Sequence, residues 1–173
     1  MTILITGGSG SGKSAYAESK AHALCPGEKI YVAAMLPFDE ESRQRIRRHR
    51  EMRREKNFIT AERYTGLKGF ELPQGSTVLL ECLSNLLANE RYMDLGAKEN
   101  AAQEILLGID HLRGLCDNVV IVTNEVFSDG AEYPGETAEY IRILGEINRC
   151  IAEISDAVVE VVCGLPVVWK GSL

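Results

Sequence analysis

A glycine-rich stretch near the start of the chain, residues 6–14, has the residue types and spacing of a phosphate-binding loop. It satisfies the pattern G-x-x-x-x-G-K-[ST], in which successive backbone N–H groups surround a polyphosphate. Its last two residues, Lys13 and Ser14, would place a positive charge on the β- and γ-phosphates and a hydroxyl on Mg²⁺. The nucleotide-contacting residues expected from this pattern are Gly7, Gly8, Ser9, Gly10, Ser11, Gly12, Lys13 and Ser14.

A second group of chemically competent side chains lies in an arginine-rich segment, residues 40–56. Arg45, His49 and Arg53 are spaced i, i+4, i+8, so they would share one face of a helix. Two guanidiniums beside an imidazole disfavour its charged form, and a neutral imidazole is a competent nucleophile. The same arginines would bind an incoming phosphate. Spacing alone nevertheless favours a simpler interpretation, a solvated charged face that contains a histidine.

A carboxylate ends the apolar segment 77–82, which reads Thr-Val-Leu-Leu-Glu-Cys. An acid at the carboxyl end of a buried strand in a P-loop protein is the usual place for a Mg²⁺-associated or general-base carboxylate. The alternative is a structural carboxylate that caps the next helix. Because a P-loop precedes it, we predict a functional rather than a structural role for Glu81, which would join Ser14 as a Mg²⁺ ligand.

These residues require a scaffold of strands and helices, which the apolar pattern predicts. Strands are expected at residues 3–5, 29–34, 77–82, 119–123, 157–163 and 167–169, and helices at 13–24, 40–56, 84–93, 100–115 and 136–154, with a loop-rich stretch at 60–75. The strand before the glycine-rich loop and the helix after it argue against an ordinary Gly/Ser turn. The alternation predicts one α/β domain over residues 1–173, a P-loop NTPase-type, mostly parallel sheet flanked by helices. The arginine-rich helix, with only Ile46 and Met52 as sizeable apolar residues, is expected to project from it or to pack on a neighbouring subunit.

Composition narrows the class of protein. The 173 residues are 45% hydrophobic and 25% charged with a net charge of -6, which disfavours nucleic acid and anionic membranes as partners. No apolar run approaches the length of a membrane span, and the chain enters a strand directly, so neither a span nor a signal peptide is expected. The five scattered cysteines contain no C-x-x-C pair and indicate reduced thiols in a cytoplasmic protein without a zinc site.

Taken together, these motifs resemble the bifunctional adenosylcobinamide kinase/adenosylcobinamide-phosphate guanylyltransferase family of cobalamin biosynthesis, nearly end to end. The resemblance is carried by Ile5-Thr6-Gly7-Gly8-x-x-Ser11-Gly12-Lys13-Ser14, Tyr31-Val32-Ala33, Asp39-x-Glu41, Arg45-Ile46-x-x-His49-x-x-x-Arg53, Thr60-x-Glu62, Leu79-Leu80-Glu81-Cys82 and Val122-Thr123-Asn124-Glu125-Val126. A P-loop alone is common to many enzymes, but its combination with R-I-x-x-H-x-x-x-R is much more specific. This combination therefore favours a functional role for His49 over a solvated charged face that merely contains a histidine.

The resemblance implies two reactions. A nucleoside triphosphate (ATP or GTP) on the P-loop would phosphorylate the aminopropanol hydroxyl of adenosylcobinamide. In the second reaction, His49 would attack the α-phosphate of GTP and form a GMP–histidine intermediate. Adenosylcobinamide phosphate would then take the GMP and become adenosylcobinamide-GDP, so that one difficult displacement is split into two.

The resemblance also assigns residues to these steps. Arg45 and Arg53 would join Lys13 in stabilising charge on the transferring phosphate, and the family's assembly is a homotrimer. The nucleotide site would be completed by Ala34, Met35, Leu36, Arg50, Glu51, Met52, Arg53, Glu62 and Glu81. The chain departs from the family pattern at Gly10, Arg54, Phe58 and the segment from Phe127 to Tyr133, which bears on substrate contacts and leaves the nucleotide-binding motif and His49 intact.

Two other functions compete with this interpretation. An ordinary P-loop small-molecule kinase would have no covalent step and would not need His49. A nucleotide-switched binding module would use the arginine-rich helix on RNA or an acidic partner, with steep salt dependence. The glutamates among the arginines, Glu51 and Glu55, the lack of interleaved aromatic residues and the acidic net charge all disfavour that module.

Overall fold

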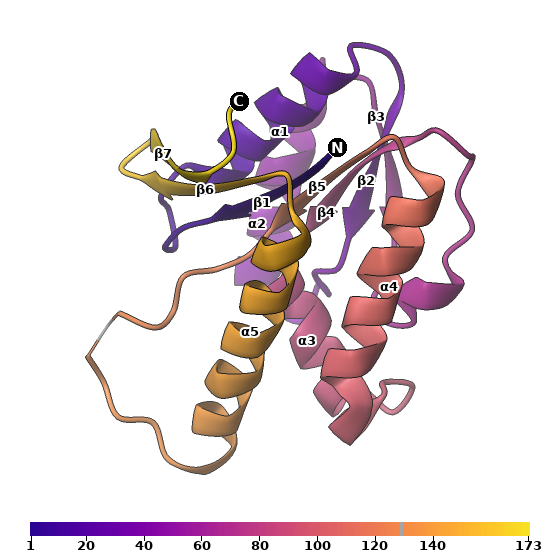
Figure 1. Ribbon diagram of the computed structural model, residues 1–173. Helices are drawn as coiled ribbons and strands as arrows, with labels where there is room; N and C mark the ends of the chain where they lie inside the picture. The colour runs from indigo at the N-terminus through magenta and orange to yellow at the C-terminus, as the bar shows by residue number, and fades with distance from the viewer. Residues whose placement is uncertain (129) are drawn as a thin grey trace.

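The computed structural model describes residues 1–128 and 130–173 of the chain. These residues form a seven-stranded sheet of order β3-β2-β4-β5-β1-β6-β7 with helices on both faces (Figure 1). The strands are β1 (Thr2–Thr6), β2 (Lys29–Ala33), β3 (Phe58–Glu62), β4 (Thr77–Glu81), β5 (Asn118–Val122), β6 (Ala157–Val162) and β7 (Leu165–Lys170). The helices are α1 (Lys13–Leu24), α2 (Glu40–Arg53), α3 (Leu83–Tyr92), α4 (Ala101–Leu115) and α5 (Gly135–Ile154), with short 3-10 turns η1 (Leu67–Gly69) and η2 (Lys98–Asn100).

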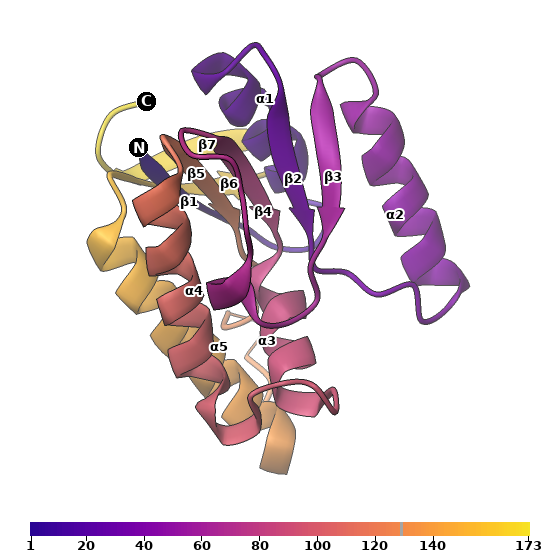
Figure 2. The ribbon, with the colours of Figure 1, turned by 90° about the vertical axis from the view of Figure 1, so that its right-hand side faces the viewer.

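Strands β1 to β6 run parallel, and alternate side chains of the central strands enter two separate cores. Ile3 and Ile5 face α1, where they pack with Ala17 and Ala21. Leu4 faces the opposite core, which lies under α3, α4 and α5 (Figure 2). The near-continuous apolar runs in these strands are therefore explained by burial on both faces, as in other parallel sheets.

Parallel pairing brings the carboxyl ends of three strands to one edge of the sheet. Ala33 of β2 is in register with Glu81 of β4, and Glu81 is in register with Val122 of β5. The glycine-rich loop follows β1, and β1 pairs with the side of β5 that faces away from β4. Because ligands of open α/β sheets bind beyond the carboxyl ends of the strands, this edge is the place to look for a site.

Three details differ from the sequence-based expectation. The strand β3 was not expected: it begins before the stretch predicted to be loop-rich, residues 60–75, and ends within it, and this edge strand is mostly solvent-exposed, which made its pattern hard to recognise. Helix α2 ends at Arg53 rather than at Lys56. The last strand is longer than expected and runs antiparallel to β6, because Cys163 and Gly164 both adopt positive φ and form a two-residue hairpin connection.

Helix α2 lies at the β3 edge of the sheet, apart from α3, α4 and α5 (Figure 2). Asp39 begins it with a capping box, since its carboxylate accepts the N–H of Ser42 at 2.7 Å and the Ser42 hydroxyl accepts the N–H of Asp39 at 3.0 Å. Within α2, every residue of which is described, Arg53 alone is buried. The expected projecting, arginine-rich helix is therefore present, and charge rather than apolar surface dominates its contact with the sheet.

Two expectations from composition can also be compared with the structure. All five cysteines are free, in agreement with the expected reduced thiols. Among the described residues, no helix combines the length and the apolar character that a bilayer crossing requires.

Candidate functional site

The glycine-rich loop has the geometry of an anion-binding turn. Gly12 adopts a φ of +91° directly before α1, and the ideal position of a Cβ there lies 3.3 Å from the Cα of Gly164. Helix α1 then begins at Lys13, so its positive N-terminal end faces the loop. The Lys13 ammonium donates to the carbonyl of Gly8 at 3.0 Å, and its burial lowers the pKa of this group while Cys82 and Glu81 counteract the shift. A buried, preoriented cation is thus available to polyphosphate at this turn.

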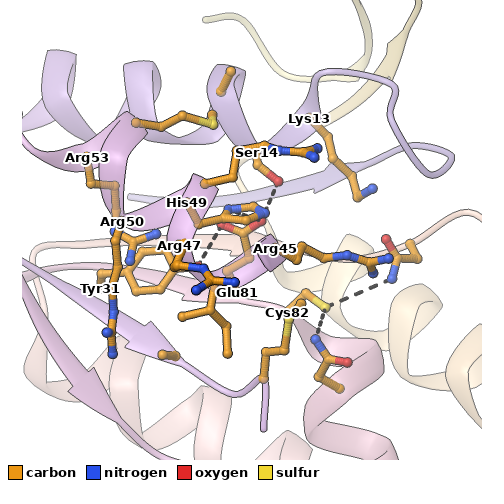
Figure 3. A pocket seen from close by; sticks show the side chains of 18 of the residues that line it. Lys13, Ser14, Tyr31, Arg45, Arg47, His49, Arg50, Arg53, Glu81 and Cys82 are labelled. Carbon is orange, nitrogen blue, oxygen red and sulfur yellow. Dashed lines mark hydrogen bonds and ion pairs between the residues drawn. The ribbon is translucent and has the colours of Figure 1, made fainter. Parts of the chain in front are cut away.

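Glu81 is the centre of the hydrogen-bond network beneath this loop (Figure 3). Its buried carboxylate accepts the hydroxyl of Ser14 and, at 3.1 Å, the phenol of Tyr31. His49 Nδ1 lies 3.5 Å from Glu81 Oε1. Burial opposes ionisation of Glu81, but His49, Ser14 and Tyr31 outweigh it, so the pKa of the carboxyl lies below its ordinary value. Burial also raises the pKa of the Tyr31 phenol far above its ordinary range, so Tyr31 remains a donor.

The surroundings of His49 differ from the sequence-based picture of an imidazole between two guanidiniums. Arg45 and Arg53 lie on opposite sides of His49 in Figure 3, but the charged group that lies beside Nδ1 of the ring is the Glu81 carboxylate, at 3.5 Å. Arg45 pairs with Glu41 at 2.6 Å, and the Arg53 guanidinium stacks on the Tyr31 ring with its Cζ 3.3 Å from the ring centroid. A carboxylate beside Nδ1 favours the tautomer that carries the proton there, which leaves the lone pair of Nε2 available for attack.

A cavity of about 900 Å³ extends from the P-loop to α2 and the ends of β2, β4 and β5. This volume lies within the usual range for small-molecule sites. The predicted site residues that line it are Ser9, Gly10, Ser11, Gly12, Lys13, Ser14, Met35, Arg45, His49, Arg50, Met52, Arg53, Glu62 and Glu81. The structure therefore brings the P-loop and the candidate nucleophile of α2 into one pocket.

Five other predicted site residues lie outside the lining of the described cavity, namely Gly7, Gly8, Ala34, Leu36 and Glu51. Ala34 is buried behind it, with its N–H on the Glu81 carbonyl at 3.0 Å. Glu51 is exposed and pairs with Arg54 at 3.5 Å. Their contact with nucleotide stays a prediction.

Several lining residues were not singled out from the sequence. Tyr31 is itself a core residue of β2, and the apolar pattern of that strand gave no sign of its contact with Glu81. Cys82, Asn85 and Asn124 form a polar group on the side of the cavity nearest β5, where Asn85 donates to the Cys82 sulfur at 3.2 Å. Cys82 and Asn124 each lie within a motif that carries the family resemblance, and these motifs were the signal available for this group.

Most of the described departures from the family pattern lie outside the lining of the cavity. Gly10 lines it directly, whereas Arg54 is solvent-exposed. Phe58 begins β3 and meets the Tyr31 ring edge-on, with ring centroids 6.3 Å apart. In the segment from Phe127 to Tyr133, Asp129 lies outside the described residues.

Two sets of side chains bear on metal binding. Ser14 and Glu81 offer the hydroxyl and carboxylate oxygens that Mg²⁺ prefers, and they contact each other at the P-loop. Glu18 of α1 also lies near this place, since ligand atoms of Glu18, His49 and Glu81 are all within 4.8 Å of one another. Arg53 and Lys56 already neutralise Glu18, so the charge balance favours the Ser14–Glu81 pair as the cation site.

Comparison with known proteins agrees with this geometry. The cobinamide kinase / cobinamide phosphate guanyltransferase family, CobU, matches residues 3–169. The bifunctional adenosylcobalamin biosynthesis protein CobU of Escherichia coli (strain K12) is 32% identical over 98% of this chain and 100% of its own length. The bifunctional adenosylcobalamin biosynthesis protein CobP of Pseudomonas aeruginosa is 31% identical over 99% of this chain and 98% of its own.

Solved structures support the fold alone. The flagellar accessory protein FlaH of Methanocaldococcus jannaschii superposes with a TM-score of 0.53 at 12% identity, over 99% of this chain and 78% of that one. An ATPase of a bacterial type III secretion system gives 0.51 at 10% identity, over 92% of this chain and 51% of that one. The sequence relatives, unlike these structures, are matched over at least 98% of their own length as well as of this chain, and with the family match they show that the chain belongs to the bifunctional cobinamide kinase / cobinamide phosphate guanyltransferase family of cobalamin biosynthesis.

Proposed function

We propose that this chain carries out both family reactions in the one cavity and that its transferase step passes through a GMP adduct on His49. The observation that supports this most directly is the contact of His49 with Glu81, which is itself hydrogen-bonded to Ser14 of the P-loop. This arrangement supports the proposal, because a nucleotide held by the loop would lie near a histidine of another element. A purely structural histidine would not require this position.

In the kinase step, Lys13 and the loop N–H groups bind the triphosphate and orient its γ-phosphate toward the hydroxyl of the cobinamide side chain. The hydroxyl oxygen forms the new P–O bond, the bond to the β-phosphate breaks, and the hydroxyl proton is released. Ser14 and Glu81 would hold Mg²⁺, which would neutralise charge on the phosphates.

In the transferase step, Nε2 of His49 attacks the α-phosphorus of GTP, and the bond to the departing pyrophosphate breaks. Glu81 beside Nδ1 holds the ring and stabilises the positive charge that develops on it. The guanidiniums of Arg45 and Arg53 stabilise charge on the transferring phosphate. A phosphate oxygen of adenosylcobinamide phosphate then forms a bond to phosphorus, the N–P bond breaks, and neutral His49 is restored.

We also infer that the chain works as a cytoplasmic homotrimer. All six residues of β7 are exposed, and Leu165 and Trp169 retain 69% and 68% of their surface. An apolar edge strand of this kind is a hazard in a monomer and is commonly covered by a partner. The five free thiols are typical of a reducing compartment.

A labelling experiment tests the covalent step. Purified protein with Mg²⁺ is incubated with GTP labelled at the α-phosphate and, separately, at the γ-phosphate, and the adduct is then challenged with acid and base. We expect protein-bound α-label that is acid-labile, base-stable, absent in His49→Ala and retained in His22→Ala, a histidine of α1 outside the cavity. If no α-label is bound while γ-phosphate still reaches cobinamide, the chain is a kinase only.

A further inference from the structure

Helix α1 buries a carboxylate that neither proposed reaction uses. Glu18 is 0% exposed, next to the core residue Ala17. A buried charge must be compensated by partners or it becomes neutral. Burial raises the pKa of Glu18, and the hydrogen bond and charge of Lys56 counteract this shift.

The partners of Glu18 come from the end of α2. Lys56, just beyond the helix, donates to Glu18 Oε2 at 2.8 Å, and Arg53 Nη1 lies 3.9 Å from Glu18 Oε1. Arg53 is itself 5% exposed and stacks on Tyr31. Ile46 and Met52 are only partly buried, and Arg53 is the buried residue of α2, so this group of charges ties the end of α2 to α1 and to Tyr31 of β2.

The attachment lies one helical turn from the candidate nucleophile. His49 and Arg53 are spaced i, i+4. A contact that fixes the C-terminal end of α2 at Arg53 therefore also fixes the position of His49 along and around the helix axis. Ligand atoms of Glu18, His49 and Glu81 already lie within 4.8 Å of one another. A shift of the helix end would therefore move His49 directly relative to Glu81 and the P-loop.

We propose that Glu18 is a positioning residue for the guanylyl transfer: it holds Arg53 and Lys56, and through them it holds His49 at the nucleotide. This inference rests on the proposed function. The kinase step depends on the turn between β1 and α1 and does not need His49. Loss of Glu18 should consequently separate the two reactions.

The test uses the full chain and two substitutions that attack the same contact from opposite sides. Glu18→Gln removes the buried charge with little change of shape. Lys56→Met removes the charged partner of Glu18 and leaves the sequence of α1, the helix after the P-loop, unchanged. Glu146→Gln is the matched control, because Glu146 lies in an exposed ion pair with Arg142 on α5. Three quantities are measured: the rate of α-label attachment to His49, the rate of γ-phosphate transfer to cobinamide, and amide hydrogen exchange in residues 40–53.

We expect Glu18→Gln and Lys56→Met each to slow α-label attachment by about 10–100-fold, the effect of a displacement of about 1 Å at a reacting centre. The γ-transfer rate should stay within about twofold of wild type, and exchange in α2 should be faster because the helix is less firmly attached. Glu146→Gln should match wild type in all three quantities.

Three results would overturn the inference: an unchanged labelling rate in both variants, an equal loss of both reactions, or unchanged exchange in α2. If Glu18→Gln does not fold, Lys56→Met decides the outcome alone. If the wild-type chain forms no adduct, the proposed function fails, and with it the transfer role of Glu18. The exchange measurement then reports separately whether Glu18 attaches α2.

Discussion

Removal of a single hydroxyl, Tyr31→Phe, measures how strongly the Glu81 carboxylate depends on its buried donors. The phenol donates to Glu81 Oε2 at 3.1 Å, and both residues are buried. Phenylalanine keeps the ring on which the Arg53 guanidinium stacks, so the substitution isolates the hydrogen bond. A hydrogen bond to a charged group contributes about 1.5–3 kcal/mol to the free energy of unfolding. At 3.1 Å this bond is longer than the usual O–H···O distance of about 2.7–2.8 Å, so we expect a loss of about 1.5–2 kcal/mol.

Tyr140→Phe provides a matched control. Its phenol donates to the carbonyl of Ser84 at 2.8 Å, so the acceptor is uncharged. The expected loss is about 0.5–1.5 kcal/mol and should not depend on the ionisation of Glu81. The two substitutions therefore differ mainly in the charge of the acceptor.

The pH dependence separates the two variants. The pKa of folded Glu81 lies below its ordinary value of 4.5, so the carboxylate stabilises the fold fully above that value. This stabilisation is lost as the pH falls through the lower, folded pKa. Because Tyr31 helps to lower that pKa, the loss of unfolding free energy caused by Tyr31→Phe should be largest at neutral pH and should become smaller in acid.

Urea unfolding followed by circular dichroism, between pH 7 and about pH 3.5 and without nucleotide, measures the penalty. A penalty for Tyr31→Phe that is as large in acid as at neutral pH would refute the view that Glu81 is an ionised, buried acceptor. So would a penalty at neutral pH smaller than that of Tyr140→Phe.

Three further predictions concern the loop, the cation site and the assembly. Gly12→Ala should lower the free energy of unfolding in urea by about 1–2 kcal/mol, because a φ of +91° strains any residue with a Cβ. Gly8→Ala is the control, since there is open space around its Cβ position, and equal losses in the two variants would contradict the argument. Ser14→Ala should reduce the Mg²⁺-dependent part of GTP affinity by about tenfold in titration calorimetry, and undiminished Mg²⁺ dependence would remove Ser14 from the cation site. Trp169→Lys, on exposed β7, should lower the mass in sedimentation equilibrium from trimer toward monomer, whereas an unchanged trimer would place the interface elsewhere.

The sequence alone determined the local structure around the P-loop. A buried strand, a glycine-rich turn and a helix follow one another along the chain, so short-range steric and hydrogen-bonding rules suffice to predict them. The apolar runs of β4 and β5 likewise predicted a doubly covered parallel sheet. The motif around His49 was local as well, and its family resemblance gave the histidine a chemical role that spacing alone did not.

The tertiary structure decided which side chains meet. In the order β4-β5-β1, Glu81 is separated from the P-loop strand by β5. The sequence paired Glu81 with Ser14 as metal ligands, but it did not indicate that Tyr31 and His49 would contact the same carboxylate. The exposed edge strand β3 was missed because its register depends on β2, its neighbour in the sheet. Glu18 offered no signal, because a carboxylate in an amphipathic helix is ordinarily exposed. Its burial depends on Arg53 and Lys56, which lie far along the chain, and such long-range charge compensation arises only when the chain is folded.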